Sequence, residues 1–209
     1  CSQRAKGMRR SKIHQALTTI AAVSTSVTLA SCGGSSEQVS GGLNAAGASF
    51  PAAIYQRWFQ ELAPEGVGVN YQSVGSGAGV RQFTAGTVDF GASDKPMKAE
   101  AIAEVSRGVV QIPMTAGAIA VAYNNPDCYL SLTQKQLAGI FLGQIKNYSE
   151  LGCTDKAINV VHRSDGSGTT YNFMKHLEAI SPEWKKDVGA DKSVKWPTGV
   201  GAKGNEGVS

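Results

Sequence analysis

Residues 43–62 read LNAAGASFPAAIYQRWFQEL, which is an apolar run, a turn of small residues and an amphipathic segment in direct succession. Residues 43–46 predict a β-strand, and residues 51–62 predict a helix because their large apolar side chains recur at helical spacing. A proline fits the first turn of a helix, where its missing N–H is not needed, and Ser49 stands near the expected N-cap. The stretch is therefore a strand–loop–helix unit.

The same unit recurs along the rest of the chain. Strands are predicted at residues 67–74, 89–92 and 158–161, and helices at residues 79–85, 98–105, from 133, 169–180, from 181 and from 204. Apolar stretches at residues 109–114 and 118–123 stand between the two groups. Strands that alternate with helices are typical of an α/β sandwich with mainly parallel sheets.

Four of the strand-to-helix junctions carry glycine and hydroxyl residues. They are residues 47–51 (GASFP), 75–79 (GSGAG), 93–96 (SDKP) and 163–169 (RSDGSGT). Ligands gather at the carboxyl ends of strands in α/β sheets, where free N–H groups and the positive end of the helix dipole favour anions. For any single junction, an ordinary turn with a helix cap is the favoured interpretation, and residues 75–79 do not continue into a Walker motif. Four in series favour an oxyanion site.

At this point a family resemblance becomes specific. The segments that carry it are residues 47–51, 88–94 (VDFGASD), 139–143 (GIFLG), 163–169, 195–197 (KWP) and 201–205 (GAKGN). They resemble the signature segments of the periplasmic phosphate-binding proteins of high-affinity phosphate ABC importers. The resemblance implies a two-lobed fold that is α/β with mainly parallel sheets. Lobe 1 is expected at residues 43–114 and lobe 2 at residues 115–209, with a hinge near residues 113–116 and a further C-terminal part after residue 209.

The same resemblance implies the phosphate ligands. They are Ser49, Phe50 (through its backbone), Ser76, Asp94, Arg163, Ser167, Gly168 and Thr169. Where the family often has a threonine, Ser49 keeps the hydroxyl group. Arg163 would supply the one full positive charge, in a planar fork that suits an oxyanion. Asp165 would orient it by a salt bridge or merely cap a turn, and Arg163 itself is alternatively a surface residue at a strand end.

Asp94 is the most informative member of this set. A carboxylate that faces an anion is unfavourable unless the anion brings a proton, and phosphate near neutral pH keeps at least one whereas sulfate keeps none. A site built around such a hydrogen bond rejects an analogue that lacks it by roughly 10⁴–10⁵-fold. The alternative is that Asp94 caps a helix that begins near Lys98.

The first 42 residues have the pattern of an export signal followed by a linker. After Met8, basic residues precede a weakly apolar stretch at residues 16–30, which is too short and too polar to span a membrane. Residues 29–32 (LASC) resemble the lipobox of bacterial lipoproteins, which makes Cys32 the expected lipidation site; a plain secretory signal is the alternative. Residues 1–31 are thus an upstream extension and signal peptide, and residues 32–42 a flexible tether.

Charge and cysteine usage narrow the function further. From Cys32 onward, 15 Lys and Arg stand against 16 Asp and Glu, which leaves no basic surplus for nucleic acid. The cysteines form no CxxC pair and the three histidines are scattered, so we expect no metal site and no cofactor. In an exported protein Cys128 and Cys153 either form a disulfide or remain independent thiols.

The interpretation is therefore a non-enzymatic, lipid-anchored protein at the periplasm or cell surface of a bacterium. It would bind inorganic phosphate and deliver it to the membrane permease of an ABC importer. The alternatives are a phosphate-ester hydrolase, a binder of another oxyanion such as sulfate, and an adhesive or signalling lipoprotein that keeps the fold without the site. A hydrolase would need a nucleophile with a base, or a metal, and the sequence places neither beside the candidate serines. We expect structural roles for His162 and for the three tryptophans, Trp58, Trp184 and Trp196.

Overall fold

The structure of the protein is a computed structural model that describes residues 42–209. The chain divides into residues 1–37 and residues 38–209, and the described residues all belong to the second unit. The predicted signal peptide, Cys32 and almost all of the tether lie outside the described residues. Among the residues that are described, no helix has the length and apolar character needed to cross a membrane.

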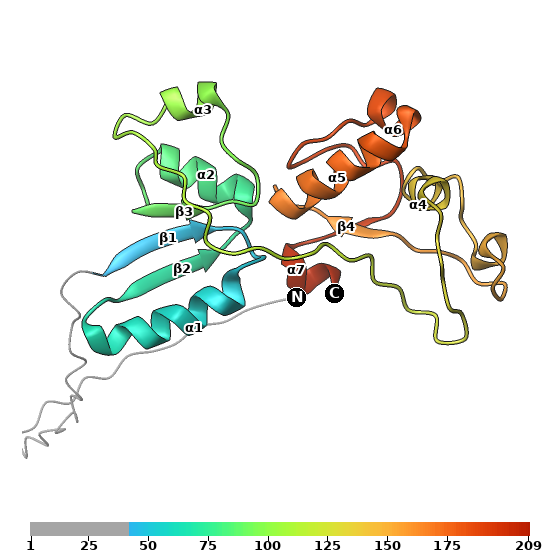
Figure 1. Ribbon diagram of the computed structural model, residues 1–209, viewed down its shortest axis with the longest axis horizontal. Helices are drawn as coiled ribbons and strands as arrows, with labels where there is room; N and C mark the ends of the chain where they lie inside the picture. Colours follow the sequence, from blue (N-terminus) through green and yellow to red (C-terminus); the bar gives the residue numbers. More distant parts are fainter. Residues whose placement is uncertain (1–41) are drawn as a thin grey trace, which may run out of the picture. The chain divides into compact units, whose positions relative to one another are not determined.

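The first sheet has three parallel strands, with β1 (Leu43–Gly47) between β2 (Val69–Ser73) and β3 (Phe90–Ala92) (Figure 1). In this register Ala45 stands beside Tyr71 and Phe90, so these three side chains share one face. All three predicted strands are confirmed, although β2 and β3 are shorter than the stretches at residues 67–74 and 89–92 that predicted them.

Two helices cover opposite faces of this sheet (Figure 1). On the face of Tyr71 lies α1 (Ala52–Leu62), whose Tyr55 ring meets the Tyr71 ring at 5.4 Å. On the other face lies α2 (Ser76–Thr84), where a Cβ at Gly79 would stand 2.4 Å from the Gly47 Cα. The helix begins at residue 76 instead of the predicted 79, because Gly75 at φ 86° turns the chain directly out of the strand.

The middle of the chain is less regular. A 3-10 turn, η1 (Ala63–Glu65), follows α1, and the short α3 (Ala99–Ala103) lies within the predicted helix at residues 98–105. Residues 109–123, which include the predicted hinge, form neither helix nor strand. The helix expected from residue 133 is α4 (Gln134–Phe141), which begins with a reciprocal capping box between Thr133 and Gln136. A disulfide joins Cys128 and Cys153, whose Cα atoms are 5.6 Å apart.

The second sheet has two parallel strands, β4 (Val161–Arg163) and β5 (Val200–Ala202). The strand predicted at residues 158–161 is therefore misplaced. The Ile158 N–H donates to the Lys146 carbonyl near the 3-10 turn η2 (Tyr148–Leu151), so the apolar run is used partly outside the sheet. The glycine-containing β5 gave no strand signal in the sequence.

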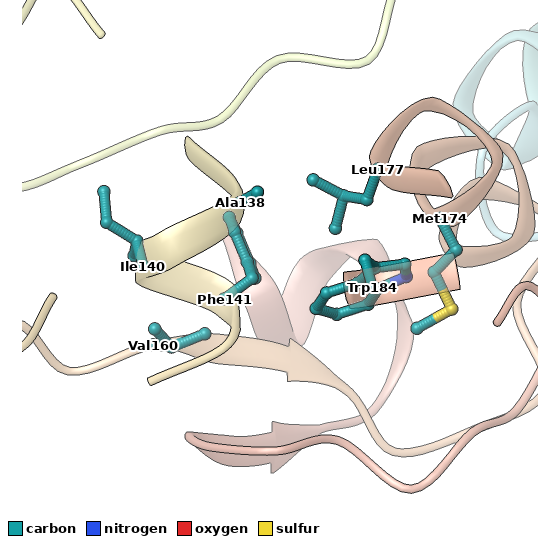
Figure 2. Packing of buried hydrophobic residues seen from close by; sticks show 7 residues of the cluster. All are labelled: Ala138, Ile140, Phe141, Val160, Met174, Leu177 and Trp184. Carbon is teal, nitrogen blue, oxygen red and sulfur yellow. The ribbon is translucent and has the colours of Figure 1, made fainter. Parts of the chain in front are cut away.

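Three helices accompany this sheet: α5 (Gly168–Ile180), α6 (Pro182–Asp187) and α7 (Gly204–Val208). Figure 2 shows the buried side chains of the core, which come from α4, α5, α6 and the approach to β4. Trp184 is fully buried there, as expected of a core tryptophan. Trp196 stacks on the His162 ring at 4.6 Å, which gives this histidine a packing role.

Candidate functional site

Hydrogen bonds join three of the four glycine-rich and hydroxyl-rich junctions around Ser76. This residue is 1% exposed at the start of α2. Its Oγ accepts the N–H of Gly168 at 3.1 Å and, more weakly, the N–H of Asp94 at 3.4 Å. The junctions after β2, β3 and β4, which are far apart in sequence, are thus brought together at one hydroxyl group.

Two other serine hydroxyls accept backbone N–H groups in the same way. The Ser167 Oγ accepts from Thr170 at 3.0 Å and caps α5. The Ser49 Oγ accepts from Asn205 at 3.1 Å, so Ser49 stands near the N-cap of α1, as predicted, but does not cap the helix. The N-cap is Pro51, and α1 has no side-chain cap hydrogen bond.

Because these serine hydroxyl groups accept backbone N–H groups, their own O–H groups can act as hydrogen-bond donors to a ligand. A serine hydroxyl has two acceptor lone pairs and one O–H donor. Because Ser49, Ser76 and Ser167 are each anchored as acceptors, their protons remain free to donate to another group. Three neutral donors held in fixed positions are the kind of group that binds an anion without adding charge.

Arg163, at the end of β4, is the buried cation of the site. Its Nε donates to Asp165 Oδ1 at 2.6 Å and its Nη2 to Asp165 Oδ2, in a bidentate pair. Its Nη1 donates to the Asn205 Oδ1 at 3.0 Å. A guanidinium group has five N–H donors, so this arrangement fixes the plane of the group and leaves two donors for a ligand. The predicted orienting role of Asp165 is thus supported by its contacts.

Gly75 packs closely against the ion pair of Arg163 and Asp165. A Cβ at residue 75 would stand 2.3 Å from the Asp165 Oδ2 and 3.4 Å from the Arg163 Nη2. With φ at 86°, the residue also has a backbone conformation that favours glycine. Any side chain here would displace the carboxylate that orients Arg163.

Asp94 brings a carboxylate into this group of donors. Its Oδ2 accepts the Thr169 hydroxyl at 3.0 Å, and its backbone carbonyl accepts the Asn172 side chain at 2.9 Å. Burial raises the pKa of Asp94, although the hydrogen bond from Thr169 and the charge of Arg163 act in the opposite direction. The alternative role of capping α3 does not hold, because the N-cap is Lys98 and no side-chain cap bond is formed there.

The two remaining candidates take part differently. Gly168 uses its N–H to bind Ser76, and a Cβ on it would stand 2.6 Å from the Asp94 Cβ. Phe50 lies in the turn between β1 and α1, and its half-exposed ring leaves no room for a side chain at Gly117. Hydrogen bonds thus join Ser76, Asp94, Gly168 and Thr169 in one set and, through Asn205, Ser49 and Arg163 in a second, while Ser167 caps α5 next to Gly168. Their role as phosphate ligands stays a prediction.

Two site residues, Asn205 and Asn172, were not identified from the sequence as such. Asn205 binds both Ser49 and Arg163, and its only signal was its place in the segment at residues 201–205. Asn172 donates to Gly168 O at 3.1 Å, one helical turn away, and also holds the Asp94 carbonyl. A helix-borne asparagine facing the site has no distinctive pattern in the sequence.

We expect the Asp165→Asn variant to lose part of the acid dependence of stability. Burial disfavours the charged form of Asp165, but hydrogen bonds from Arg163 and Gly204 outweigh it, so the folded pKa is lowered. The ionised carboxylate therefore contributes stability above its unfolded pKa of about 3.9, and this contribution disappears as the pH falls through the folded value.

Urea unfolding between about pH 2.5 and pH 7 measures this effect. The excess in unfolding free energy of the wild type over the variant should be constant near neutral pH and shrink below about pH 4. Asp127→Asn is the control, because Asp127 is exposed and forms no ion pair in the described part of the chain. A pH-independent excess would contradict the prediction.

Comparison with known proteins places this geometry in context. A family model described as a PBP superfamily domain matches residues 33–208. The phosphate-binding protein PstS of Pasteurella multocida (strain Pm70) is 48% identical over 180 residues, covering 80% of this chain and 52% of the relative. The phosphate-binding protein PstS of Haemophilus influenzae is also 48% identical over 180 residues, covering 80% of this chain and 53% of the relative. This chain thus spans about half the length of these curated relatives.

The fold of this chain is also similar to that of a solved structure. It is described as a phosphate ABC transporter substrate-binding protein with bound phosphate from Clostridium perfringens, and it matches with a TM-score of 0.56 at 20% identity. The match covers 80% of this chain and 64% of that chain. At this identity the likeness speaks for the fold alone. The predicted family resemblance and the predicted α/β class with parallel sheets are both confirmed.

Proposed function

Because this chain belongs to the PBP superfamily, we propose that the protein binds inorganic phosphate outside the cytoplasmic membrane and delivers it to the permease of an ABC-type importer. The names of the relatives support the choice of phosphate. The site supports it independently, since it combines a guanidinium group that Asp165 orients, several neutral donors and a second carboxylate, that of Asp94.

The carboxylate of Asp94 is the observation that carries the proposal. The Arg163 and serine side chains can donate to an anion, whereas the Thr169 hydroxyl already donates to Asp94. The Asp94 carboxylate offers only acceptors when it is ionised. An anion that fits must therefore hold a proton of its own. Hydrogen phosphate has such a proton and sulfate has none, so the arrangement favours phosphate by the hydrogen bond from P–OH to Asp94.

In this proposal the remaining ligands bind the phosphate oxygens. The two free N–H groups of Arg163 would bind phosphate oxygens as a fork. The O–H groups of Ser49, Ser76 and Ser167 would donate to the remaining oxygens. The N-terminal end of α5 would add the partial positive charge of its dipole.

The wider features of the sequence belong to the same proposal. Residues 43–114 and 115–209 would form parts of two lobes that close over the anion about a hinge near residues 113–116. Lipidation at Cys32 would hold the protein at the outer face of a bacterial membrane, with residues 32–42 as a tether. We assign it no catalytic activity, because the relatives are named for binding phosphate.

Calorimetric titration with phosphate near pH 7 tests the function. We expect saturable binding that a hundredfold excess of sulfate does not displace, and no hydrolysis of p-nitrophenyl phosphate. The folded state is verified in the same sample by thermal unfolding, which phosphate should shift to higher temperature. A folded protein that gives no binding signal with phosphate would contradict the proposal, and displacement by sulfate would point to another oxyanion.

A further inference from the structure

Lys95 is a charged side chain that the fold buries, since only 7% of the residue is exposed. Lysines are rarely buried without a partner, because removing an ammonium group from water is costly. The Nζ of Lys95 lies 2.7 Å from the Asp191 Oδ1 and 4.1 Å from the centre of the Tyr171 ring. Lys95 follows β3, whereas Tyr171 lies in α5 and Asp191 follows α6. The side chain therefore links two distant parts of the chain.

Each end of this link is fixed to a part of the candidate site. On one side, the Ser93 hydroxyl accepts the Lys95 N–H at 3.1 Å and donates to the Lys95 carbonyl at 2.7 Å, which restrains the backbone on both sides of Asp94. On the other side, the carbonyl of the residue after Asp191 accepts the Ser167 N–H at 2.8 Å. The Lys95–Asp191 pair thus connects the loop of Asp94 to the support of Ser167.

The charges nearby make Asp191 the required partner. The hydrogen bond from Lys95 is the main cause that lowers the pKa of Asp191, so the Asp191 carboxylate is ionised at neutral pH. Lys192 lies close enough to be affected as well, because burial and then repulsion from Lys95 and Arg81 lower its pKa. Without the Asp191 carboxylate, the positive charges of Lys95 and Lys192 would lie close together with no counter-charge.

We propose that Lys95, Asp191 and Tyr171 form a latch that holds the loop of Asp94 against the segment of Ser167 while phosphate is bound. The proposal rests on the phosphate-binding function. Lys95 acts in it as a positioning residue, because its Nζ is engaged by Asp191 and Tyr171 and the anion is left to other groups. The latch sets how long phosphate stays in the site, and it leaves the choice between phosphate and sulfate to Asp94.

The expected effect follows from the population of the closed arrangement. Apparent affinity is the intrinsic affinity reduced by the fraction of molecules in the binding-competent state. Removing the latch lowers that fraction and speeds opening, while the groups that contact the anion are unchanged. The dissociation rate should therefore rise and the ratio of phosphate to sulfate affinity should stay as it is.

Lys95→Met and Asp191→Asn, singly and together, test the latch in the whole protein. Stopped-flow measurement of phosphate dissociation should show an increase of about tenfold for each single variant. The double variant should add little more, since both changes break one interaction. Lys175→Met is the matched control: its ion pair with Glu178 at 2.6 Å lies within α5 and joins no two segments of the site, so the phosphate dissociation rate of this variant should change less than about twofold.

Hydrogen exchange provides a second measurement that needs no ligand. In both latch variants the amides of residues 93–95 and 189–192 should exchange faster than in the wild type and in Lys175→Met. Wild-type dissociation rates and wild-type exchange in folded Lys95→Met would overturn the latch, as would a changed preference between phosphate and sulfate. If the wild type itself binds no phosphate, the proposed function fails, and the exchange data still decide whether Lys95 joins these segments.

Discussion

Asp94→Asn should lower the preference of the protein for phosphate over sulfate by at least about 10³-fold. The side chain keeps its shape and can still accept the Thr169 hydroxyl through its amide oxygen, so the local hydrogen bond at 3.0 Å is retained. The amide nitrogen, however, replaces an acceptor by a donor. Sulfate would then meet a donor where it previously met a carboxylate, and the proton of phosphate would lose its partner. Phosphate affinity should fall while sulfate affinity rises.

Competition calorimetry with both anions near pH 7 measures this change. Asp187→Asn, an exposed aspartate in α6, is the same chemical change outside the site and should leave both affinities as they are. The preference of the wild type for phosphate over sulfate depends on a proton that phosphate carries. Measuring this preference at several pH values is therefore a further test. If Asp94→Asn still rejects sulfate as the wild type does, a group other than Asp94 must accept the hydrogen bond from the phosphate proton.

The second large effect is expected for Arg163→Met. Truncating one partner of a buried, hydrogen-bonded charge pair costs about 2–5 kcal/mol, which corresponds to roughly 30- to 5,000-fold in affinity. The anion loses the two donors of Arg163, and Asp165 loses its counter-charge and becomes an unpaired, partly buried carboxylate. The two effects act in the same direction. Arg163→Lys should recover only part of the affinity, since an ammonium group cannot form the fork.

Arg57→Met is the matched control for this variant. Arg57 also pairs with a carboxylate at 2.7 Å, but its ion pair with Glu61 lies on the exposed side of α1, where such pairs contribute little. Thermal unfolding without phosphate separates lost binding from lost folding. Phosphate affinity within threefold of the wild type in folded Arg163→Met would remove Arg163 from the proposed ligands.

Local contacts of the site could be predicted from the sequence, and long-range contacts could not. Arg163 and Asp165 are two residues apart at the end of a strand, so their pairing was a natural alternative from the start. Ser167 caps α5 by a bond to Thr170, three residues on, a spacing that the sequence itself displays. The bonds from Asn205 to Ser49 and from Lys95 to Asp191 join residues 156 and 96 positions apart, and no periodicity encodes such pairs.

The fold shows the same division between local and long-range information. The strands of the first sheet follow short apolar or alternating stretches that end at glycine or serine, and their prediction was confirmed. The error at residues 158–161 arose because Ile158 satisfies its backbone near residue 146, a contact that depends on tertiary structure. The strand β5 was missed because two of its three residues, Gly201 and Ala202, have no strong preference for strands.

The bond between Ser49 and Asn205 also has a consequence for the order of events during synthesis. At about 5–20 residues per second, a ribosome adds the 156 residues between these partners in roughly 8–30 seconds. For all of that time the serine at the end of β1 lacks its backbone donor, and Arg163 lacks one of its two anchors for part of it. The contacts that Asn205 makes with Ser49 and Arg163 therefore form only after residue 205 has been synthesised, long after the first sheet of the fold is complete in sequence.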